Sequence, residues 1–449
     1  MTVGVLRSPD QVSLGVLTTT VPRRAVDEAI TACGARERRS DGKLPAHVVA
    51  YLTMALCLFG DDDYEEVATK VTGSLSVWGS WDAAWSVPTS SGITQARKRL
   101  GPNVMREVFE RVAEPVALPV AGPVAVAHLS PWRGSWLRGR RLVAVDGFEA
   151  DVPDSAANAA EFGYAGGHAH SAFPKVRVVT LAECGTHAFL AAQVGPCARG
   201  EKTLAAGLWP RLQPGEMLVA DRNFYSFAGW SAAADTGADL LWRAPTGLTL
   251  PIVKVLPDGT FATVLIRPGL RSTRPAYQQL LADARAGRDL DPAQARLARV
   301  VEYDVPDRGD PRDHPNNGHE TGNGNGDSNG GSDGGSELIV LLSTILDPDR
   351  AGAEELADAY HQRWEHETAY DQLKTHLRGP ARVLRSRLPD LVYQEVWAWL
   401  IVHHALSALI ARAAEATRQD PDRISYTDTL RVARRTATGT ATFRPAPLD

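Results

Sequence analysis

The sequence predicts an α/β protein with a mixed-sheet core, an all-helical N-terminal region and a β-rich insertion. Residues 14–120 carry apolar helical runs, of which 46–60 (AHVVAYLTMALCLFG) is the clearest. Between residues 140 and 250, short β-branched runs alternate with helical segments, which is typical of an α/β core. Residues 250–305 place strand-like runs around an Asp-Gly turn, the pattern of a β-hairpin. These three observations define the fold class.

Two apolar runs of the core are each followed directly by an aspartate. The run RLVAV is typical of a strand covered on both faces, and we expect this strand to end at Asp146. The run EMLVA predicts a second buried strand that ends at Asp221. Ligands of open α/β sheets collect at the carboxyl ends of strands, although an aspartate there is also a common turn or helix cap. Both aspartates are therefore candidate site residues.

Further strands and one long loop follow from composition. The runs 173–181 (FPKVRVVTL) and 187–194 (HAFLAAQV) predict an antiparallel hairpin, and 337–345 (ELIVLLSTI) a buried strand. Residues 307–336 are so rich in Gly, Asn and Asp that they cannot form a core, so we expect them to be disordered. Deleting 308–335 should leave a folded and active protein.

The stretch YHQRWEHETAYDQLK is expected to be a helix with several functional groups on one stripe. At 100° per residue, Arg363, Glu367 and Lys374 all fall within roughly 60° of Tyr360. Asp371 falls on the same stripe, so periodicity alone does not choose between it and Glu367. An arginine four residues before a glutamate is also a common surface pair of a helix.

Two strand-end aspartates and one helix glutamate have the chemistry needed for hard divalent cations. Mg²⁺ prefers oxygen ligands and is usually held by a few carboxylates together with substrate phosphates. Two such ions, about 3.5–4 Å apart, can assist an in-line phosphoryl transfer. Arg363 and Lys374 would then bind phosphate groups beside the metal ions. A glycosidase also uses paired carboxylates, but its chemistry gives no reason for these basic groups.

Net charge, basic clusters, cysteine content and hydropathy indicate which other classes of protein the sequence favours. The net charge is −5 and the pI about 6.2, so overall charge does not indicate a nucleic-acid-binding protein. A basic cluster in the N-terminal region (Arg97, Lys98, Arg99) is either a solvated helix face or a helix that reads DNA. The four cysteines form no CxxC pair and are expected to be free thiols in a reducing cytoplasm. We predict neither a signal peptide nor a membrane span.

The chain resembles the DDE transposases of the insertion sequence 4 family. The signature Tyr-x2-Arg-x3-Glu-x6-Lys, which begins at Tyr360, matches at all four positions. VAVDG around Asp146 and ADRNFYS around Asp221 match the two aspartate motifs, and LLWR at 240–243 is similar to the strand that follows. The resemblance covers residues 14 to 412. It implies an RNase-H-like core with a β-rich insertion between the second aspartate and the glutamate.

By this resemblance, Asp146, Asp221 and Glu367 are the catalytic residues and the ligands of two Mg²⁺ or Mn²⁺ ions. The implied reaction is hydrolysis at the 3′ ends of a transposon, hairpin formation through the freed hydroxyl and strand transfer into target DNA. The residues expected to contact DNA are Tyr360, Arg363, Lys374, Arg97, Lys98 and Arg99.

The resemblance also implies partners and a domain plan. The partners are double-stranded DNA, as terminal inverted repeats and target, and a second copy of the chain when paired ends are held. No membrane is involved, and the protein is expected in the bacterial cytoplasm, associated with the nucleoid. The expected parts are an N-terminal helical DNA-binding domain (1–125), a first core part (138–248), the insertion (249–336), a second core part (337–415) and a C-terminal tail (416–449).

Other interpretations remain open at this point. A nuclease of the same fold would cleave DNA without joining it. A transposase relative that only binds DNA would act as a regulator or scaffold without cleaving it. Some family members steady a flipped base with a tryptophan; Trp242 and Trp364 are candidates, and core packing is expected for each. His168 and His170 are expected to lie in a glycine-rich loop rather than in a metal site.

Overall fold

The computed structural model describes residues 14–36, 44–77, 87–118, 132–166, 171–271, 274–305, 337–379 and 382–438. The predicted disordered loop at 307–336 lies outside these residues, as do His168 and His170. The expectations for those segments therefore stay predictions.

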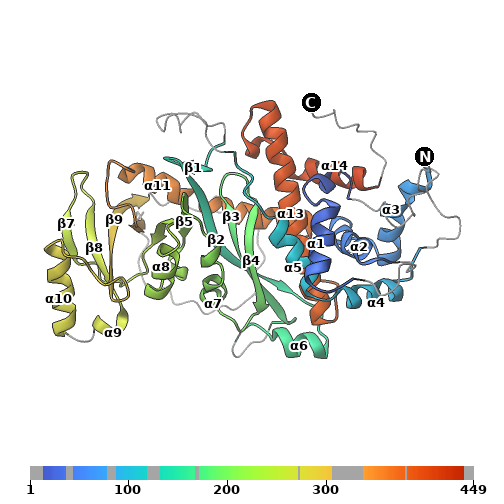
Figure 1. Cartoon of the computed structure of the whole chain (residues 1–449), viewed down its shortest axis with the longest axis horizontal. Helices are drawn as coiled ribbons and strands as arrows, with labels where there is room; N and C mark the ends of the chain where they lie inside the picture. The colour runs from blue at the N-terminus through green and yellow to red at the C-terminus, as the bar shows by residue number, and fades with distance from the viewer. Residues whose placement is uncertain are drawn as a thin grey trace, which may run out of the picture.

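One mixed sheet of ten strands runs through the molecule (Figure 1). Its order is β4-β3-β2-β5-β6-β10-β9-β8-β7, with the short β1 paired to β2. β2, β5 and β6 are parallel, and all other neighbours are antiparallel. The strands are β1 Trp136–Leu137, β2 Arg140–Asp151, β3 Lys175–Glu183, β4 Phe189–Pro196, β5 Glu216–Ala220, β6 Asp239–Arg243, β7 Ile252–Val255, β8 Phe261–Ile266, β9 Ala295–Val305 and β10 Glu337–Ser343.

The first five strands of that order confirm the expected core. A strand (β2) continues into an antiparallel hairpin (β3 and β4), and two parallel strands (β5 and β6) follow on its other side. This is the arrangement of an RNase-H-like sheet. The predicted hairpin of the insertion is also present, as β7 and β8, which continue the same sheet through β9 and β10. Its turn contains Gly259, whose φ of +83° suits a residue without a Cβ.

The expectation that the first strand ends at Asp146 is wrong. β2 continues for five residues beyond it, because β3 pairs with β2 as far as Asp151. The neighbouring β5 ends at Ala220, opposite Val145 and one residue before the predicted end at Asp221. From Asp146 onward β2 therefore pairs with β3 only. On its other side, where β5 has ended, β2 forms the predicted edge of the sheet.

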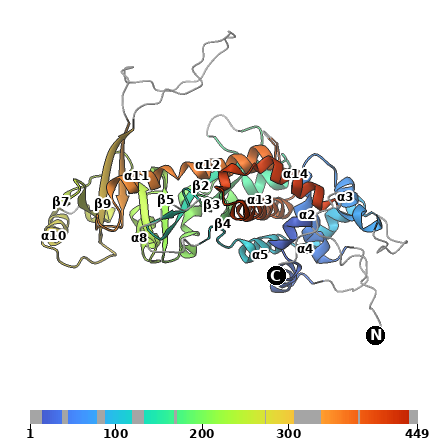
Figure 2. The same cartoon turned by 90° about the horizontal axis from the view of Figure 1, so that it is seen from above.

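Helices cover both faces of the core sheet. Val143 and Val145 of β2 pack on the side of α7 (Glu201–Ala206) and α8 (Phe227–Ala234). Leu142 and Ala144 pack on the other side, with α11 (Ala353–His361). Side chains alternate along a strand, so Asp146 belongs to the α11 side. In Figure 2, α11 and the following helix run along this side towards the helical end of the molecule.

The helical end joins segments from both ends of the chain. A single apolar core contains buried residues of the N-terminal helices, of two late helices and of the near face of β2 and β3 (Figure 1). The helices are α1 Arg23–Ala32, α2 Ala46–Leu58, α3 Tyr64–Val77, α4 Ser90–Leu100, α5 Asn103–Val112, α13 Pro389–Thr417 and α14 Tyr426–Ala437. The segment expected to be a tail thus contributes a packed helix, α14.

Helix α13 is the centre of that core. Among the described residues, it is the one helix long and apolar enough to cross a membrane, yet 78% of its most apolar window is buried inside the protein. All four cysteines are free.

Candidate active site

The two aspartates are brought together by strand register. Val145 of β2 is paired with Ala220 of β5 in parallel, so Asp146 and Asp221 are the next residues on neighbouring strands. The amide of Gly147 donates a 2.8 Å hydrogen bond to Oδ1 of Asp146. Burial raises the pKa of Asp146 to about 6, although this amide and the charge of Arg363 both lower it. A carboxylate here is costly without a nearby cation.

The segment with the four-residue signature is not one regular helix, which corrects the sequence expectation. α11 ends at His361, α12 spans Trp364–Asp371, and a π-helical turn (η6, Gln372–Leu377) follows. Between α11 and α12 the amides of Arg363 and His366 bond to carbonyls three residues back, which tightens the chain. A constant 100° per residue therefore does not hold across the signature.

A chain of hydrogen bonds fixes α12 on the sheet. Nε2 of His366 lies 2.8 Å from Oγ1 of Thr180, which lies 2.9 Å from the hydroxyl of Tyr370. That hydroxyl donates to the backbone carbonyl of Asp146 at 2.5 Å. Burial lowers the pKa of His366 to about 3, so its ring is neutral at pH 7. If Nε2 of His366 donates to Thr180 and Thr180 donates to Tyr370, each of these contacts has one donor and one acceptor. Nδ1 of His366 is buried without a hydrogen-bond partner among the described residues.

The structure distinguishes Glu367 from Asp371, which helical periodicity alone could not do. Oε1 of Glu367 lies 3.3 Å from Nη2 of Arg363, and its charge contributes to the raised pKa of Asp146. Asp371 instead accepts a 2.5 Å hydrogen bond from Thr375 and lies 3.6 Å from His376. Glu367 is thus the acid beside the strand aspartates, while its role as a metal ligand stays a prediction.

Tyr360 and Arg363 lie deep in the site. Tyr360 is only 4% exposed and packs in the apolar core below α11. Burial raises its pKa to about 12; Arg363 lowers that pKa and the charge of Asp221 raises it. Arg363 is 8% exposed, and its Nε is buried without a hydrogen-bond partner among the described residues. Arg363 thus interacts with Asp146 and Glu367, and Tyr360 lies close to the charge of Asp221.

Lys374 of the signature is half-buried, and Trp364, which lies between two signature residues, is exposed. The ammonium of Lys374 lies 5.4 Å from the ring centres of both Phe148 and Tyr370. Burial and the neighbouring Arg378 lower its pKa, while Asp146 raises it. The indole of Trp364 is 54% exposed, with the guanidinium of Arg363 4.7 Å from its ring centre.

The expectation of core packing is confirmed for one tryptophan and wrong for the other. Trp242 is fully buried on the α8 side of the sheet. Trp364 is exposed because it follows the turn between α11 and α12, where the ring rests on Arg363 instead of the core.

A fourth carboxylate, from Glu201, was missed by sequence reasoning. A Cβ placed on Gly147 would lie 2.9 Å from Oε1 of Glu201, so this carboxylate packs against the backbone of β2. Its charge raises the pKa of Asp146, more strongly than that of Glu367 does. Among the described residues no hydrogen bond or ion pair of this carboxylate is found. The sequence signal was weak: an acid at the start of a short helix after β4.

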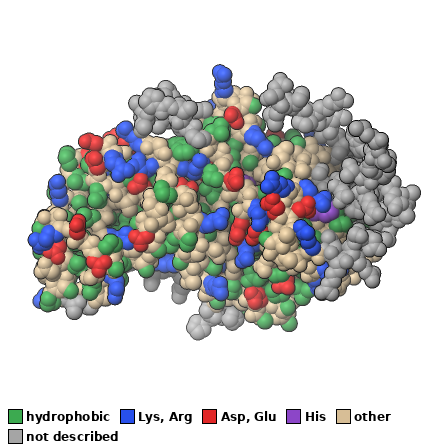
Figure 3. Space-filling model, in the orientation of Figure 1, with side chains coloured by type: hydrophobic (Ala, Val, Ile, Leu, Met, Phe, Trp, Pro, Cys, Tyr) green, Lys and Arg blue, Asp and Glu red, His purple; other side chains and the backbone are tan. Residues whose placement is uncertain are grey.

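The basic cluster of α4 is divided by the fold. Arg97 is 1% exposed and bonds to Tyr64, Ser386, Gln394 and the carbonyl of Leu391. The expectation that Arg97 contacts DNA is therefore corrected: its guanidinium ties α4 to the start of α13. Lys98 and Arg99 are exposed, and their DNA contacts stay a prediction. On the face drawn in Figure 3, basic and acidic side chains are interspersed.

The donor chemistry of Asp146, Asp221, Glu367 and Glu201 fits hard divalent cations. All four donors are carboxylates, and after burial the charges of Glu201 and Glu367 also raise the pKa of Asp146. Their oxygens do not form the tightest cluster, however. In the part of the chain that the structure describes, the trio with ligand atoms all within 4.8 Å of one another is His187, Glu365 and Asp422.

The chain is similar to known transposases over most of its length. The family model described as "Insertion element 4 transposase N-terminal" matches residues 11–110, and "Transposase DDE domain" matches residues 137–403. "Transposase InsG for insertion sequence element IS4" of Escherichia coli (strain K12) is 23% identical over 393 residues, covering 86% of this chain and 74% of that protein. "Putative transposase InsZ" of the same strain is 26% identical over 182 residues, covering 40% of this chain and 57% of that protein.

A solved structure is similar at low level. The piggyBac transposase synaptic complex with hairpin DNA matches with a TM-score of 0.42 and 8% identity, covering 95% of this chain and 80% of that one. A score of this size supports no conclusion on its own.

Proposed function

Since this chain belongs to the DDE transposases of the insertion sequence 4 family, which cleave and join DNA with divalent metal ions, we propose that Asp146, Asp221 and Glu367 are its catalytic carboxylates. The observation that carries the proposal is the parallel register of β2 and β5, which places the two aspartates side by side. The hydrogen bonds of His366 to Thr180 in β3 and of Tyr370 to Asp146 in β2 then hold α12, and with it Glu367, against the sheet.

The three carboxylates would hold two Mg²⁺ or Mn²⁺ ions together with the scissile phosphate, and Glu201 stands beside them as a fourth oxygen donor. When bound, such ions activate the attacking oxygen and stabilise the leaving one. The protein's own part is to hold the carboxylates on rigid elements and to keep Asp146 ionised through the Gly147 amide and Arg363.

DNA contacts are proposed for the largely buried Arg363, the half-buried Lys374 and the exposed Lys98 and Arg99. The guanidinium of Arg363 can bind a phosphate oxygen next to the carboxylates, and Lys374 can supply a point charge. Tyr360 is too deeply buried to meet DNA first, so we assign it to orienting Arg363 beside Asp221. Lys98 and Arg99 would contact the DNA backbone from α4.

Strand transfer through hairpin ends is proposed on the exposure of Trp364. An exposed indole beside an arginine offers a stacking surface for a base that leaves the duplex. We also propose that two copies act together on paired ends, in the cytoplasm where bacterial DNA lies. The domain boundaries given above remain part of this proposal, with one core uniting the N-terminal helices, α13 and α14.

The test is a denaturing-gel cleavage assay. The purified protein is mixed with end-labelled duplex containing the DNA that flanks its gene, with Mg²⁺ or Mn²⁺, beside Glu367→Gln and the matched control Asp371→Asn. We expect nicks and hairpin-sized products with the wild-type protein and Asp371→Asn, and end binding without cleavage with Glu367→Gln. Cleavage by Glu367→Gln at a near-normal rate would refute the assignment of the acid.

Two other functions predict different gels. A nuclease of the same fold would give nicks but no joined products. A binding-only relative would shift the end-labelled duplex and cleave it under no metal condition. The placement of Asp146 and Asp221 on neighbouring strands, with Glu367 and Glu201 near Asp146, favours the cleaving enzyme, because a protein that only binds DNA has no use for these carboxylates.

A further inference from the structure

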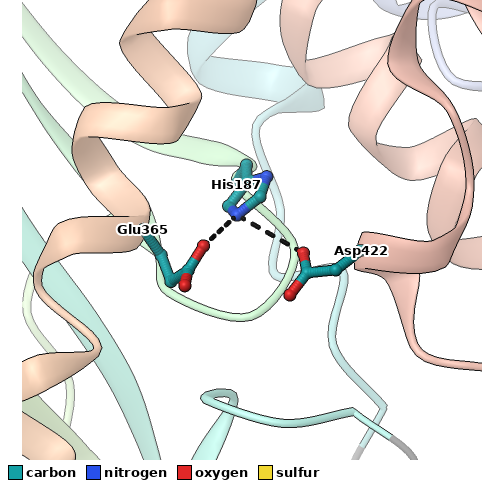
Figure 4. A group of neighbouring side chains, drawn as sticks. All are labelled: His187, Glu365 and Asp422. Atoms are coloured by element: carbon teal, nitrogen blue, oxygen red, sulfur yellow. Dashed lines mark hydrogen bonds and ion pairs between the residues drawn. The ribbon is translucent and has the colours of Figure 1, made fainter. Parts of the chain in front are cut away.

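A second group of possible metal ligands lies around Glu365 of α12 and includes neither of the two strand aspartates. It consists of His187, Glu365 and Asp422, called here the His187 cluster (Figure 4). Nε2 of His187 lies 2.9 Å from Oε2 of Glu365 and 3.7 Å from Oδ1 of Asp422. Glu365 and Glu367 are two residues apart on α12, about 200° around the helix, so they point in different directions.

The cluster joins three segments that are distant in sequence. His187 lies in the turn between β3 and β4, Glu365 in α12, and Asp422 in the short helix η7 (Pro421–Arg423) between α13 and α14. Figure 4 shows the imidazole between the two carboxylates. Whatever binds these three groups therefore ties the core sheet, the signature segment and the C-terminal helices together.

The charges in the cluster are not balanced by the protein. Two carboxylates face a single imidazole, and among the described residues neither forms an ion pair with a lysine or an arginine. A cation between the three groups would offset the repulsion between the two carboxylates.

The other side of the imidazole supplies a second observation. The amide of Gln372 lies 2.9 Å from Nδ1 of His187, with its nitrogen facing the ring. Its oxygen, Oε1, is buried without a hydrogen-bond partner among the described residues. Turning the amide by 180° lets Oε1 accept a hydrogen bond from Nδ1–H, which leaves the lone pair of Nε2 directed at the two carboxylates. Metal-binding histidines have this pattern, with the far nitrogen donating to an oxygen.

The backbone of His187 is also unusual. Its φ is +59°, a conformation that residues other than glycine rarely adopt. The turn from Glu183 to Ala188 keeps it there through the hydrogen bond from the amide of His187 to the carbonyl of Glu183. Strained backbone that persists next to clustered ligands is typical of functional sites.

We propose that His187, Glu365 and Asp422 bind one divalent cation of the Zn²⁺ or Mn²⁺ type, separate from the catalytic carboxylates. One imidazole nitrogen with two carboxylate oxygens is a donor set suited to such ions. The ion fixes α12 to η7 and to the β3–β4 turn, and it thereby holds the segment on which Glu367 is carried. The site is independent of the role proposed for Glu367.

The test measures binding of Zn²⁺ to the full-length, untagged protein by calorimetry and by thermal unfolding. The background carries Asp146→Asn, Asp221→Asn and Glu367→Gln, so the proposed catalytic carboxylates do not contribute. We expect one equivalent of Zn²⁺ and a rise in Tm. Adding His187→Ala should weaken binding at least 100-fold and abolish the rise in Tm, while Gln372→Ala should weaken binding about 10- to 100-fold.

The matched control is His376→Ala in the same background. His376 also lies beside an acid, Asp371 at 3.6 Å, but among the described residues it belongs to no group of three possible ligands, so this variant should bind Zn²⁺ like its parent. If His187→Ala does not fold, Glu365→Gln, which keeps the side chain's size, replaces it with the same expectation. Absence of Zn²⁺ binding in the background protein, or binding undiminished in His187→Ala or Glu365→Gln, would overturn the proposal.

Discussion

The hydroxyl of Tyr370 donates a 2.5 Å hydrogen bond to the backbone carbonyl of Asp146. The two residues are 224 positions apart, and this bond connects α12, which carries one proposed catalytic acid, to the strand that carries another. The ring of Tyr370 also packs edge-on against Phe148 of the same strand. The position of Glu367 relative to Asp146 therefore depends on Tyr370.

Tyr370→Phe should loosen that connection. Removing the hydroxyl leaves buried groups of Thr180 and Asp146 short of a partner, so we expect the free energy of unfolding to fall by about 1–3 kcal/mol. Cleavage should fall roughly 10- to 100-fold, because small displacements of catalytic groups are costly. Tyr393→Phe, whose hydroxyl bonds only to Glu161 at an exposed site, is the control for urea unfolding and gel cleavage. Unchanged values for Tyr370→Phe would contradict the connection.

Glu201→Gln should raise the metal concentration needed for cleavage while leaving end binding intact. The reason is that Glu201 adds negative charge beside Asp146. Gly147→Ala should act in the same direction, since its Cβ would lie 2.9 Å from Oε1 of Glu201 and displace the carboxylate. Titrations of cleavage against Mn²⁺, with Glu161→Gln as an exposed control, measure the effect. Identical titrations for wild-type protein and Glu201→Gln would remove Glu201 from the site.

Asp146→Asn should stabilise the metal-free protein in a pH-dependent way. Burial raises the pKa of Asp146 from 3.8 to about 6, so the folded state holds its proton more tightly than the unfolded state. The stabilisation that protonated Asp146 gives the folded state is fully present below about pH 4 and is lost as the pH rises through 6. At pH 8 the variant should thus exceed the wild type by roughly 2–3 kcal/mol, with the gap closing near pH 4. Urea unfolding in chelator at both pH values checks this; a gap independent of pH would contradict it.

The basic residues of α4 should separate into two classes. Arg97→Ala should lower the free energy of unfolding by roughly 2–4 kcal/mol, because the buried groups of Gln394, Ser386 and Leu391 lose a charged donor. The double variant Lys98→Ala with Arg99→Ala should unfold like the wild type but bind end DNA more weakly, with a shallower salt dependence. Thermal unfolding and gel shifts at several salt concentrations distinguish them. Unaltered DNA binding by the double variant would exclude α4 from the interface.

Trp364→Ala should leave the fold stable and reduce hairpin products relative to first-strand nicks. The indole is 54% exposed, so its loss costs little packing, whereas a flipped base would lose its stacking surface. Trp242→Ala, by contrast, removes a fully buried ring and should cost about 3–5 kcal/mol of stability. Quantified nick and hairpin bands together with melting curves test both. A normal hairpin fraction in Trp364→Ala would assign the stacking role elsewhere.

Local sequence patterns determined much of the architecture. The apolar runs before Asp146 and Asp221 form neighbouring parallel strands, and the Asp-Gly turn closes the hairpin of the insertion. Alternation and turn chemistry are properties of short segments, so they can be predicted without knowing what packs against them. The two strand aspartates followed from the same patterns.

Only the tertiary structure decided between groups that the sequence left equivalent. Arg97, Lys98 and Arg99 are consecutive, yet only Arg97 is buried, because α4 presents it to the start of α13. Glu201 had only a weak signal and the His187 cluster had none, since the residues that meet there come from segments far apart in the chain. Periodicity could not choose between Glu367 and Asp371 either. Hydrogen bonds to Thr180 and to the carbonyl of Asp146 set the rotation of α12, and long-range contacts of this kind are absent from any local pattern.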